Sequence, residues 1–184
     1  MQNLFLFRFR YRNMVLFLLT GLSVALMTGL SGCKFQYGIG YNEGYSPTQP
    51  IAFDHSIHVE QNKIQCNYCH NQGERSTAQN IPALSTCMNC HLTVKTDSPE
   101  IQKLRNAYDK GQSIEWVKVH MLPDHVKFNH SAHLAKGLAC NTCHGPVETM
   151  KQIYQYSDLS MGWCVNCHRQ PENHAPLNCS TCHN

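Results

Sequence analysis

The sequence predicts a chain that is mostly coil, with short α-helices packed around bound groups and little or no β-sheet. Three observations predict this class. Ten of the 11 cysteines fall into five Cys-x-x-Cys-His motifs of identical spacing in a chain of 184 residues. Strand signals are weak along the whole sequence. The apolar core that the polypeptide can form by itself is small for this length, so bound groups must supply much of the buried apolar surface.

The N-terminus has the order of a bacterial export signal. It begins with a basic head that contains Arg8, Arg10 and Arg12. An apolar run from Met14 to Leu30 follows, and the sequence Leu-Ser-Gly-Cys, which resembles a lipobox, ends at Cys33. Residues 1–32 are therefore predicted to be a lipoprotein-type signal peptide, with Cys33 as the lipid-modified first residue; a retained membrane helix is the alternative. Either arrangement places the remaining chain on the periplasmic side of a bacterial membrane.

The charge distribution excludes one class of partner. The full sequence has a formal net charge of +3, from 15 basic and 12 acidic residues. Three of the basic residues precede Cys33, so the remaining 12 balance the 12 acidic residues. The mature polypeptide has no basic run, and nucleic-acid binding is therefore not expected.

The five motifs carry the predicted chemistry. Two cysteines three residues apart on a tight turn reach the two vinyl groups at one edge of a porphyrin, and the histidine that follows points onto its iron. This spacing is the attachment site of a c-type haem, so the sequence predicts a multihaem cytochrome c with five covalently attached haem c groups. The attachment residues are Cys66, Cys69, Cys87, Cys90, Cys140, Cys143, Cys164, Cys167, Cys179 and Cys182. The iron-ligating histidines of the motifs are His70, His91, His144, His168 and His183.

Three other kinds of site fit the motifs less well. A structural zinc site combines two Cys-x-x-Cys knuckles, which would leave one of the five unpaired and would not require a histidine after each. A disulfide between cysteines three residues apart closes a tiny loop and stabilises little. A thioredoxin-like dithiol is expected once, within a βαβ pattern.

Seven histidines lie outside the motifs, and four of them occur in an internal repeat. The pattern Phe-x-His-Ser-x-His starts at Phe53 and again at Phe128, shortly before a Cys-Asn-x-Cys-His motif that is followed by another motif. We therefore expect a duplicated two-haem unit, with a fifth haem added at the C-terminus. Two histidines three residues apart share one side of a helical turn, so they are expected to ligate two different irons. These second ligands are His55, His58, His130 and His133.

The second ligand of the fifth iron has several candidates. His120 is the expected ligand, because it lies in the apolar stretch WVKVHMLPDHV, which can approach a buried ring. Met121 and His125 lie in the same stretch, and ligation by methionine would raise the potential of that haem. His174 lies in a polar segment typical of a surface loop.

The mature chain divides into five predicted segments. Its clearest helix signal has Ser98 as N-cap, Pro99 in the first turn and Gly111 as C-terminal cap. The segments are a flexible tether at 33–49, a first two-haem unit at 50–95, a linking helix at 96–112, a second two-haem unit at 113–170 and a tail with the fifth haem at 171–184.

The Phe-x-His-x-x-His pattern resembles that of the cytochrome c3/c7 class. In that class the first histidine ligates the haem attached next, and the second ligates a different haem. The resemblance implies the pairs His55 with His70 and His130 with His144, and places His58 and His133, most simply, on the haems at Cys87 and Cys164.

Longer stretches are similar to the pentahaem cytochrome subunit of alternative complex III. They cover roughly residues 46–184 and include SPTQPIAFDHSIH, IPALSTCMNCH, WVKVHMLPDHVKFNHSAH and LSMGWCVNCHR. The resemblance implies a quinol-oxidising membrane complex with iron–sulfur (molybdopterin-like) and quinol-oxidising subunits, and a monohaem cytochrome c or a terminal oxidase as acceptor. Subunits of that family are typically held by a retained helix, whereas Leu-Ser-Gly-Cys predicts lipidation.

The predicted function is electron transfer, without catalysis by the chain itself. All five motifs end in histidine and the remaining histidines outnumber the irons, so no iron is expected to keep an open position for a substrate. A multihaem reductase for a small oxyanion is the alternative from the enzyme class. An independent periplasmic or surface electron shuttle is a further alternative.

Overall fold

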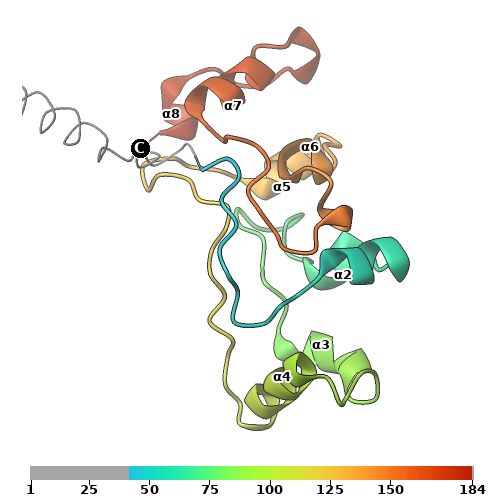
Figure 1. The fold of residues 1–184 in the computed structure, drawn as a ribbon. Helices are drawn as coiled ribbons and strands as arrows, with labels where there is room; N and C mark the ends of the chain where they lie inside the picture. The colour runs from blue at the N-terminus through green and yellow to red at the C-terminus, as the bar shows by residue number, and fades with distance from the viewer. Residues whose placement is uncertain (1–41, 184) are drawn as a thin grey trace, which may run out of the picture. The chain divides into compact units, whose positions relative to one another are not determined.

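The computed structural model describes residues 42–183, and the predicted signal peptide, Cys33 and the start of the tether lie outside this range. The helices in chain order are η1 (Ser56–Gln61), α2 (Cys66–Cys69), α3 (Leu84–His91), α4 (Pro99–Asp109), α5 (His130–Ala135), α6 (Asn141–His144), η2 (Val147–Thr149), α7 (Met161–His168), η3 (Pro171–Asn173) and α8 (Cys179–Cys182). Within residues 42–183 there is no strand, and an isolated antiparallel bridge joins Val126 to His183. The predicted class of short helices in a chain that is mostly coil is confirmed (Figure 1). None of the described helices is long and apolar enough to cross a membrane.

Each of the five motifs lies on a helical turn. Helices α2 and α8 consist of a Cys-x-x-Cys segment alone, α6 begins directly after Cys140, and α3 and α7 end on the histidine of their motif. Residues three apart in a helix face the same side, so each turn presents its two thiols together. Helices of four residues are too short to be stable alone, so their conformation depends on packing and on bound groups.

Helix α4 occupies the predicted linking segment, and the local sequence determines both of its ends. Pro99 is its first residue and Ser98 is its N-cap, although the serine hydroxyl makes no capping hydrogen bond. At the other end, Gly111 and the residue after it donate backbone N–H groups to carbonyls of the last turn, which is the Schellman pattern. Gly111 has φ of +63°, a conformation that glycine adopts readily.

The two Phe-x-His-Ser-x-His segments share the same side-chain hydrogen bonds, although η1 is a π-helix and α5 is an α-helix. In the first, Asp54 Oδ1 accepts hydrogen bonds from the backbone N–H (2.8 Å) and the hydroxyl (2.6 Å) of Ser56. In the second, Asn129 Oδ1 accepts the corresponding bonds from Ser131, at 3.0 and 2.7 Å. Asn129 is thus the N-cap of α5, whereas Asp54 makes the same bonds one residue before His55, the N-cap of η1. The hydrogen bond from the Ser56 side chain is the main reason that the pKa of Asp54 is lowered.

Each repeat is anchored on the loop that follows the first motif of the other repeat. The backbone N–H of His55 donates to the carbonyl of Met150 at 3.1 Å, and that of His130 donates to the carbonyl of Thr77 at 3.1 Å. Helix η1 consequently packs against η2. Cys140, directly before α6, lies beside Cys66, the first residue of α2. The first and third motifs therefore adjoin at the centre of the described chain.

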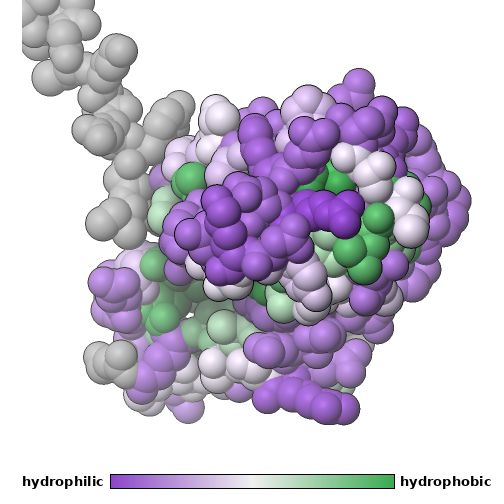
Figure 2. Space-filling view, turned by 90° about the horizontal axis from the view of Figure 1, so that it is seen from below, coloured by the Kyte–Doolittle hydropathy of each residue, from purple (hydrophilic) through white to green (hydrophobic). Residues whose placement is uncertain are grey.

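The polypeptide core is small. The buried apolar side chains among residues 42–183 are Ile51, Met88, Leu104, Ala107, Val119 and Met150. Figure 2 shows a mainly hydrophilic face on which apolar side chains are recessed in hollows. So few buried side chains do not balance the conformational entropy lost when a chain of this length is ordered. Additional apolar groups must therefore be buried in the native protein.

Gly145 directly follows the third motif and allows a close aromatic contact. Its φ of 70° and ψ of −162° lie in a region that residues with a Cβ strongly avoid. A Cβ added at this position would also overlap the ring of Tyr156.

Substitution Gly145→Ala is expected to destabilise the native protein by about 3 kcal/mol, because backbone strain and overpacking add. The matched control is Gly137→Ala, at a glycine with φ of +78° and open space around the added Cβ. This control carries only the backbone strain, about 1 kcal/mol. Denaturant unfolding measures both losses, and equal values would contradict the role of the Tyr156 contact.

Candidate haem-binding sites

The ten motif cysteines are available for covalent bonds. All ten are unpaired thiols, and each is exposed or partly exposed. Burial is the main reason that the pKa values of Cys69, Cys87 and Cys143 are raised, so these thiols are neutral at pH 7. A thiol–disulfide oxidoreductase instead lowers the pKa of its reactive cysteine, so the motifs do not resemble redox dithiols.

Seven histidine rings share one hydrogen-bond arrangement, in which Nδ1 faces a backbone carbonyl oxygen. A carbonyl only accepts, so the proton is on Nδ1 and the lone pair of Nε2 is available to a metal. The contacts are His58 to Asp54 (2.8 Å), His70 to Asn80 (2.7 Å), His91 to Val94 (3.0 Å), His130 to Thr77 (3.1 Å), His133 to Asn129 (2.7 Å), His168 to Pro176 (2.8 Å) and His183 to His125 (3.4 Å).

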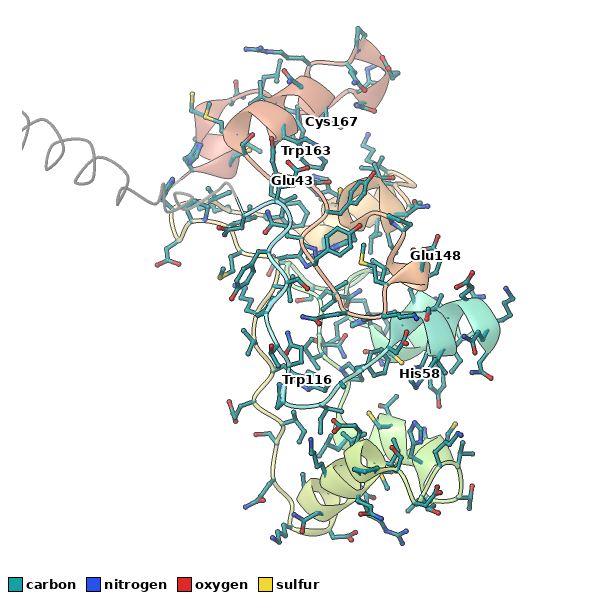
Figure 3. The ribbon with its side chains drawn as sticks, viewed as in Figure 1. Glu43, His58, Trp116, Glu148, Trp163 and Cys167 are labelled. Atoms are coloured by element: carbon teal, nitrogen blue, oxygen red, sulfur yellow. The ribbon has the colours of Figure 1, made fainter. Side chains whose placement is uncertain are left out.

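Histidines of the motifs face histidines from outside the motifs. An imidazole nitrogen lies about 2 Å from the metal it binds, so two imidazoles on opposite sides of one metal have ring centroids about 6 Å apart. Figure 3 shows His58 between the ribbons of α2 and α3, and His91 is the last residue of α3. The centroid distances are 6.0 Å for His58–His91, 6.4 Å for His130–His144, 6.0 Å for His133–His168 and 5.5 Å for His125–His183.

His55, which precedes the first motif, does not make the Nδ1 contact with a backbone carbonyl. Burial lowers its pKa to about 4, with further contributions from the nearby rings of His70 and His58. Its Nδ1 is buried and has no hydrogen-bond partner. A neutral imidazole therefore lies near His70 at the first motif.

One phenylalanine in each repeat contacts both histidines of the pair. Phe53 stacks on His58 with 4.4 Å between ring centroids and meets the ring of His55 edge-on at 4.8 Å. In the second repeat, Phe128 stacks on His133 with 4.5 Å between ring centroids and meets the ring of His130 edge-on at 4.8 Å. These contacts hold the two imidazoles of each pair at a fixed mutual angle.

The motifs follow one another in space in an order that differs from the sequence. Helix η1 joins the first and second motifs through its histidine pair, and α5 joins the third and fourth. The first and third motifs adjoin, because Cys140 lies beside Cys66 and contributes, after burial, to its raised pKa. The fourth motif adjoins the fifth, because Cys182 lies near Cys164 and contributes, after burial, to its raised pKa. The order along the molecule is α3, α2, α6, α7, α8 (Figure 1).

The two repeats match a known family. The sequence signature described as "Cytochrome c7 and related cytochrome c" matches residues 51–110 and 126–184, one match for each repeat and more than half of the chain in all. The chain belongs to the cytochrome c7 family. This membership implies covalently bound haem c with its iron, and the ten paired cysteines provide attachment for several haems.

This multihaem cytochrome also resembles a subunit of a menaquinone reductase. The multihaem cytochrome c subunit of menaquinone reductase from Nitratidesulfovibrio vulgaris is 29% identical over 161 residues, which cover 73% of this chain and 76% of the relative. The relative is part of a reductase complex and is not the whole enzyme. The family and this relative together identify the chain as an electron-transfer cytochrome.

The residues at the motifs are suited to haem c. Each motif presents two thiols from one helical turn, and paired imidazole rings lie 5.5–6.4 Å apart beside four of the five motifs. A hollow of about 480 Å³ near the fourth motif is lined by Glu43, Gly44, Tyr154, Tyr156, Ser157, Asp158 and Trp163. Figure 3 shows Trp163 and Glu43 in the same part of the molecule as Cys167.

The structure brings His125, and not the expected His120, to the fifth motif. The segment around His125 pairs through its main chain with α8, since the N–H of Lys127 donates to the carbonyl of Cys182 at 2.7 Å. His120 lies instead against His144 of the third motif, with 4.4 Å between ring centroids. The apolar stretch does approach the fifth motif, but through His125, while its His120 lies at the third motif. Of the other candidates, His174 is exposed at the end of η3 and Met121 is partly exposed.

The residues that orient the imidazoles were not among the predicted site residues. Asp54 and Asn129 accept hydrogen bonds at the start of the two turns and also contact the second histidine of each pair through their carbonyls. An Asp or Asn directly before each His-Ser pair is an N-cap signal that could have indicated this role. The carbonyls of Thr77, Asn80 and Pro176 have no such signal, because every residue type supplies a carbonyl.

Proposed function

We propose that this cytochrome carries five haem c groups, each attached through the two cysteines of one motif and ligated by two histidines. The imidazole pairs about 6 Å apart, beside helical turns that present two thiols each, are the observation that carries the proposal. A haem held in this way supplies reversible one-electron exchange and has no open position for a substrate. The proposed ligand pairs are His55 with His70, His58 with His91, His130 with His144, His133 with His168 and His125 with His183.

The row of motifs supports transfer between two partners. The motifs on α3 and α8 stand at its two ends, with the motifs on α2, α6 and α7 between them. Electrons that arrive beside one end leave beside the other, so we propose one docking partner near α3 and another near α8. The polypeptide sets the spacing and the ligands, and these determine distances and potentials.

The proposed setting is a membrane complex that oxidises quinol, as in alternative complex III. The long similar stretches in residues 46–184 support quinol oxidation. The relative, a multihaem subunit of a menaquinone reductase, supports a complex that reacts with quinones but not this direction. The partners would be iron–sulfur and quinol-oxidising subunits, with a monohaem cytochrome c or a terminal oxidase as acceptor. Attachment to the periplasmic side of a bacterial membrane would use the lipid on Cys33 or the N-terminal helix.

A second candidate is electron flow toward the quinone. It is favoured by the relative, which its name describes as part of a reductase of menaquinone. The same row of motifs would serve either direction, because one-electron exchange at a six-coordinate haem is reversible. The direction of electron flow depends on the quinone-reactive partner and on the reduction potentials of the haems relative to the quinone.

Purification of the native complex in mild detergent tests the proposal. Mass spectrometry is expected to find the cytochrome together with iron–sulfur and quinone-reactive subunits. Added quinol should reduce the haems of the oxidised complex if quinol is the donor, and a reduced complex should produce quinol from quinone if the direction is reversed. A cytochrome recovered without membrane subunits would contradict the proposal and favour the independent shuttle.

A further inference from the structure

The histidine of the third motif has a different hydrogen-bond partner from the histidines of the other motifs. Nδ1 of His144 lies 3.3 Å from Nε2 of His120, and the two rings are nearly perpendicular at 79°. In each of the other four motifs the same nitrogen faces a backbone carbonyl. Within residues 42–183, the third motif is therefore the one whose histidine is held by a side chain.

The chemistry of ligation determines the direction of this hydrogen bond. When the lone pair of His144 Nε2 binds iron, the proton of that ring is on Nδ1, which donates. Nε2 of His120 is then the acceptor. An imidazole nitrogen is a stronger base than a carbonyl oxygen, so it draws the Nδ1 proton more strongly and makes His144 a more electron-rich ligand. An electron-rich axial ligand stabilises ferric iron and lowers the reduction potential.

The segment that carries His120 is fixed in place by a side chain from a distant part of the chain. The amide group of Gln49 donates to the carbonyl of Val117 at 2.9 Å and accepts from the N–H of the same residue at 2.9 Å. Val119, next to His120, is buried with 8% of its surface exposed. The His120 ring is thus presented to His144 by a segment with little freedom to move.

We propose that His120 is a positioning residue of the third site, which orients the His144 imidazole and lowers the potential of the haem attached at Cys140 and Cys143. The inference rests on the proposed function, because it requires His144 to ligate iron. It differs from the expectation that His120 binds iron itself. The reduction potential of the haem at Cys140 and Cys143 would then depend on the side chain of His120.

The test compares two variants of the haem-loaded protein by potentiometric titration. His120→Leu removes the acceptor and keeps an apolar side chain of similar reach, whereas His120→Gln keeps an acceptor oxygen. In His120→Leu, the reduction potential of one haem is expected to rise by about 59 mV. For a one-electron couple this shift raises the ratio of reduced to oxidised haem by about tenfold at a fixed applied potential. His120→Gln is expected to restore most of the wild-type value, and the electron paramagnetic resonance spectrum should change for the same component alone.

Three results would overturn the inference. These are unchanged potentials in His120→Leu, equal shifts in both variants, or a high-spin haem in His120→Leu, which would make His120 a ligand. If a variant fails to mature, nitrogen-15 NMR of the unaltered, fully reduced protein gives the answer. A scalar coupling across the N–H···N bond between two histidine rings is expected, and its absence contradicts the inference. Loss of the five-haem stoichiometry would instead contradict the proposed function.

Discussion

His125→Ala is expected to convert one haem of the oxidised protein from low spin to high spin. The structure places the His125 ring 5.5 Å from the ring of His183, with its neighbours paired to α8 through the main chain. Removing the imidazole leaves the fifth iron with one strong axial ligand from the protein. About one fifth of the low-spin signal should be lost, because one of five haems is affected. Electron paramagnetic resonance of the oxidised protein measures both the loss and the new high-spin signal.

His174→Ala is the matched control for this prediction. His174 belongs to the same C-terminal region, was a candidate for the same iron, and is exposed at the end of η3. Its removal should leave all haems low spin. A His125→Ala protein that remains entirely low spin would contradict the assignment. A high-spin signal in His174→Ala would indicate that His174, and not His125, is the second ligand of the fifth iron.

Protein produced without haem attachment is expected to show no cooperative thermal transition. The buried apolar side chains of the described chain are few, and α2, α6 and α8 have four residues each. Helices of this length do not persist without tertiary contacts, and the missing contacts are those with porphyrin. The free energy of unfolding, about 5–15 kcal/mol for an ordinary domain, should fall to about zero.

The comparison uses residues 42–184 expressed in two ways. Export into a compartment with haem-attachment enzymes supplies the loaded protein, and expression in the cytoplasm supplies the same chain without haem. Circular dichroism at increasing temperature is the measurement for both. A sigmoidal melt in the haem-free chain would show that the polypeptide folds by itself and would contradict the account.

Much of the fold class and many of the candidate ligands could be predicted because they depend on local spacing. The distance between the cysteines of a motif determines that both thiols share one side of a turn, and α2 and α8 show this geometry. The histidine pairs at the start of η1 and on α5 are likewise related by spacing, and each pair does lie near two different motifs. The capped helix α4 lies where its Ser-Pro start and its glycine end predict.

The contacts between distant segments could not be predicted from such patterns. His120 and His125 lie five residues apart in one apolar stretch, and both were candidates for the same iron. The main-chain bonds to α8 and the Gln49 contact with Val117 direct them to different motifs. Backbone hydrogen bonds of this kind depend on the tertiary structure, and almost any residue type can form them, so the sequence does not reveal them. For the same reason, the spatial order of the motifs does not follow from their order in the chain.

Haem stoichiometry is the measurement that tests the central claim most directly. The exported, matured protein should have the mass of its polypeptide plus five tetrapyrroles, and all five should stay bound after denaturation because thioethers are covalent. Peptides from each motif should carry one haem apiece. A mass with fewer than five added tetrapyrroles, or haem that leaves the denatured chain, would contradict the account of five attached haems.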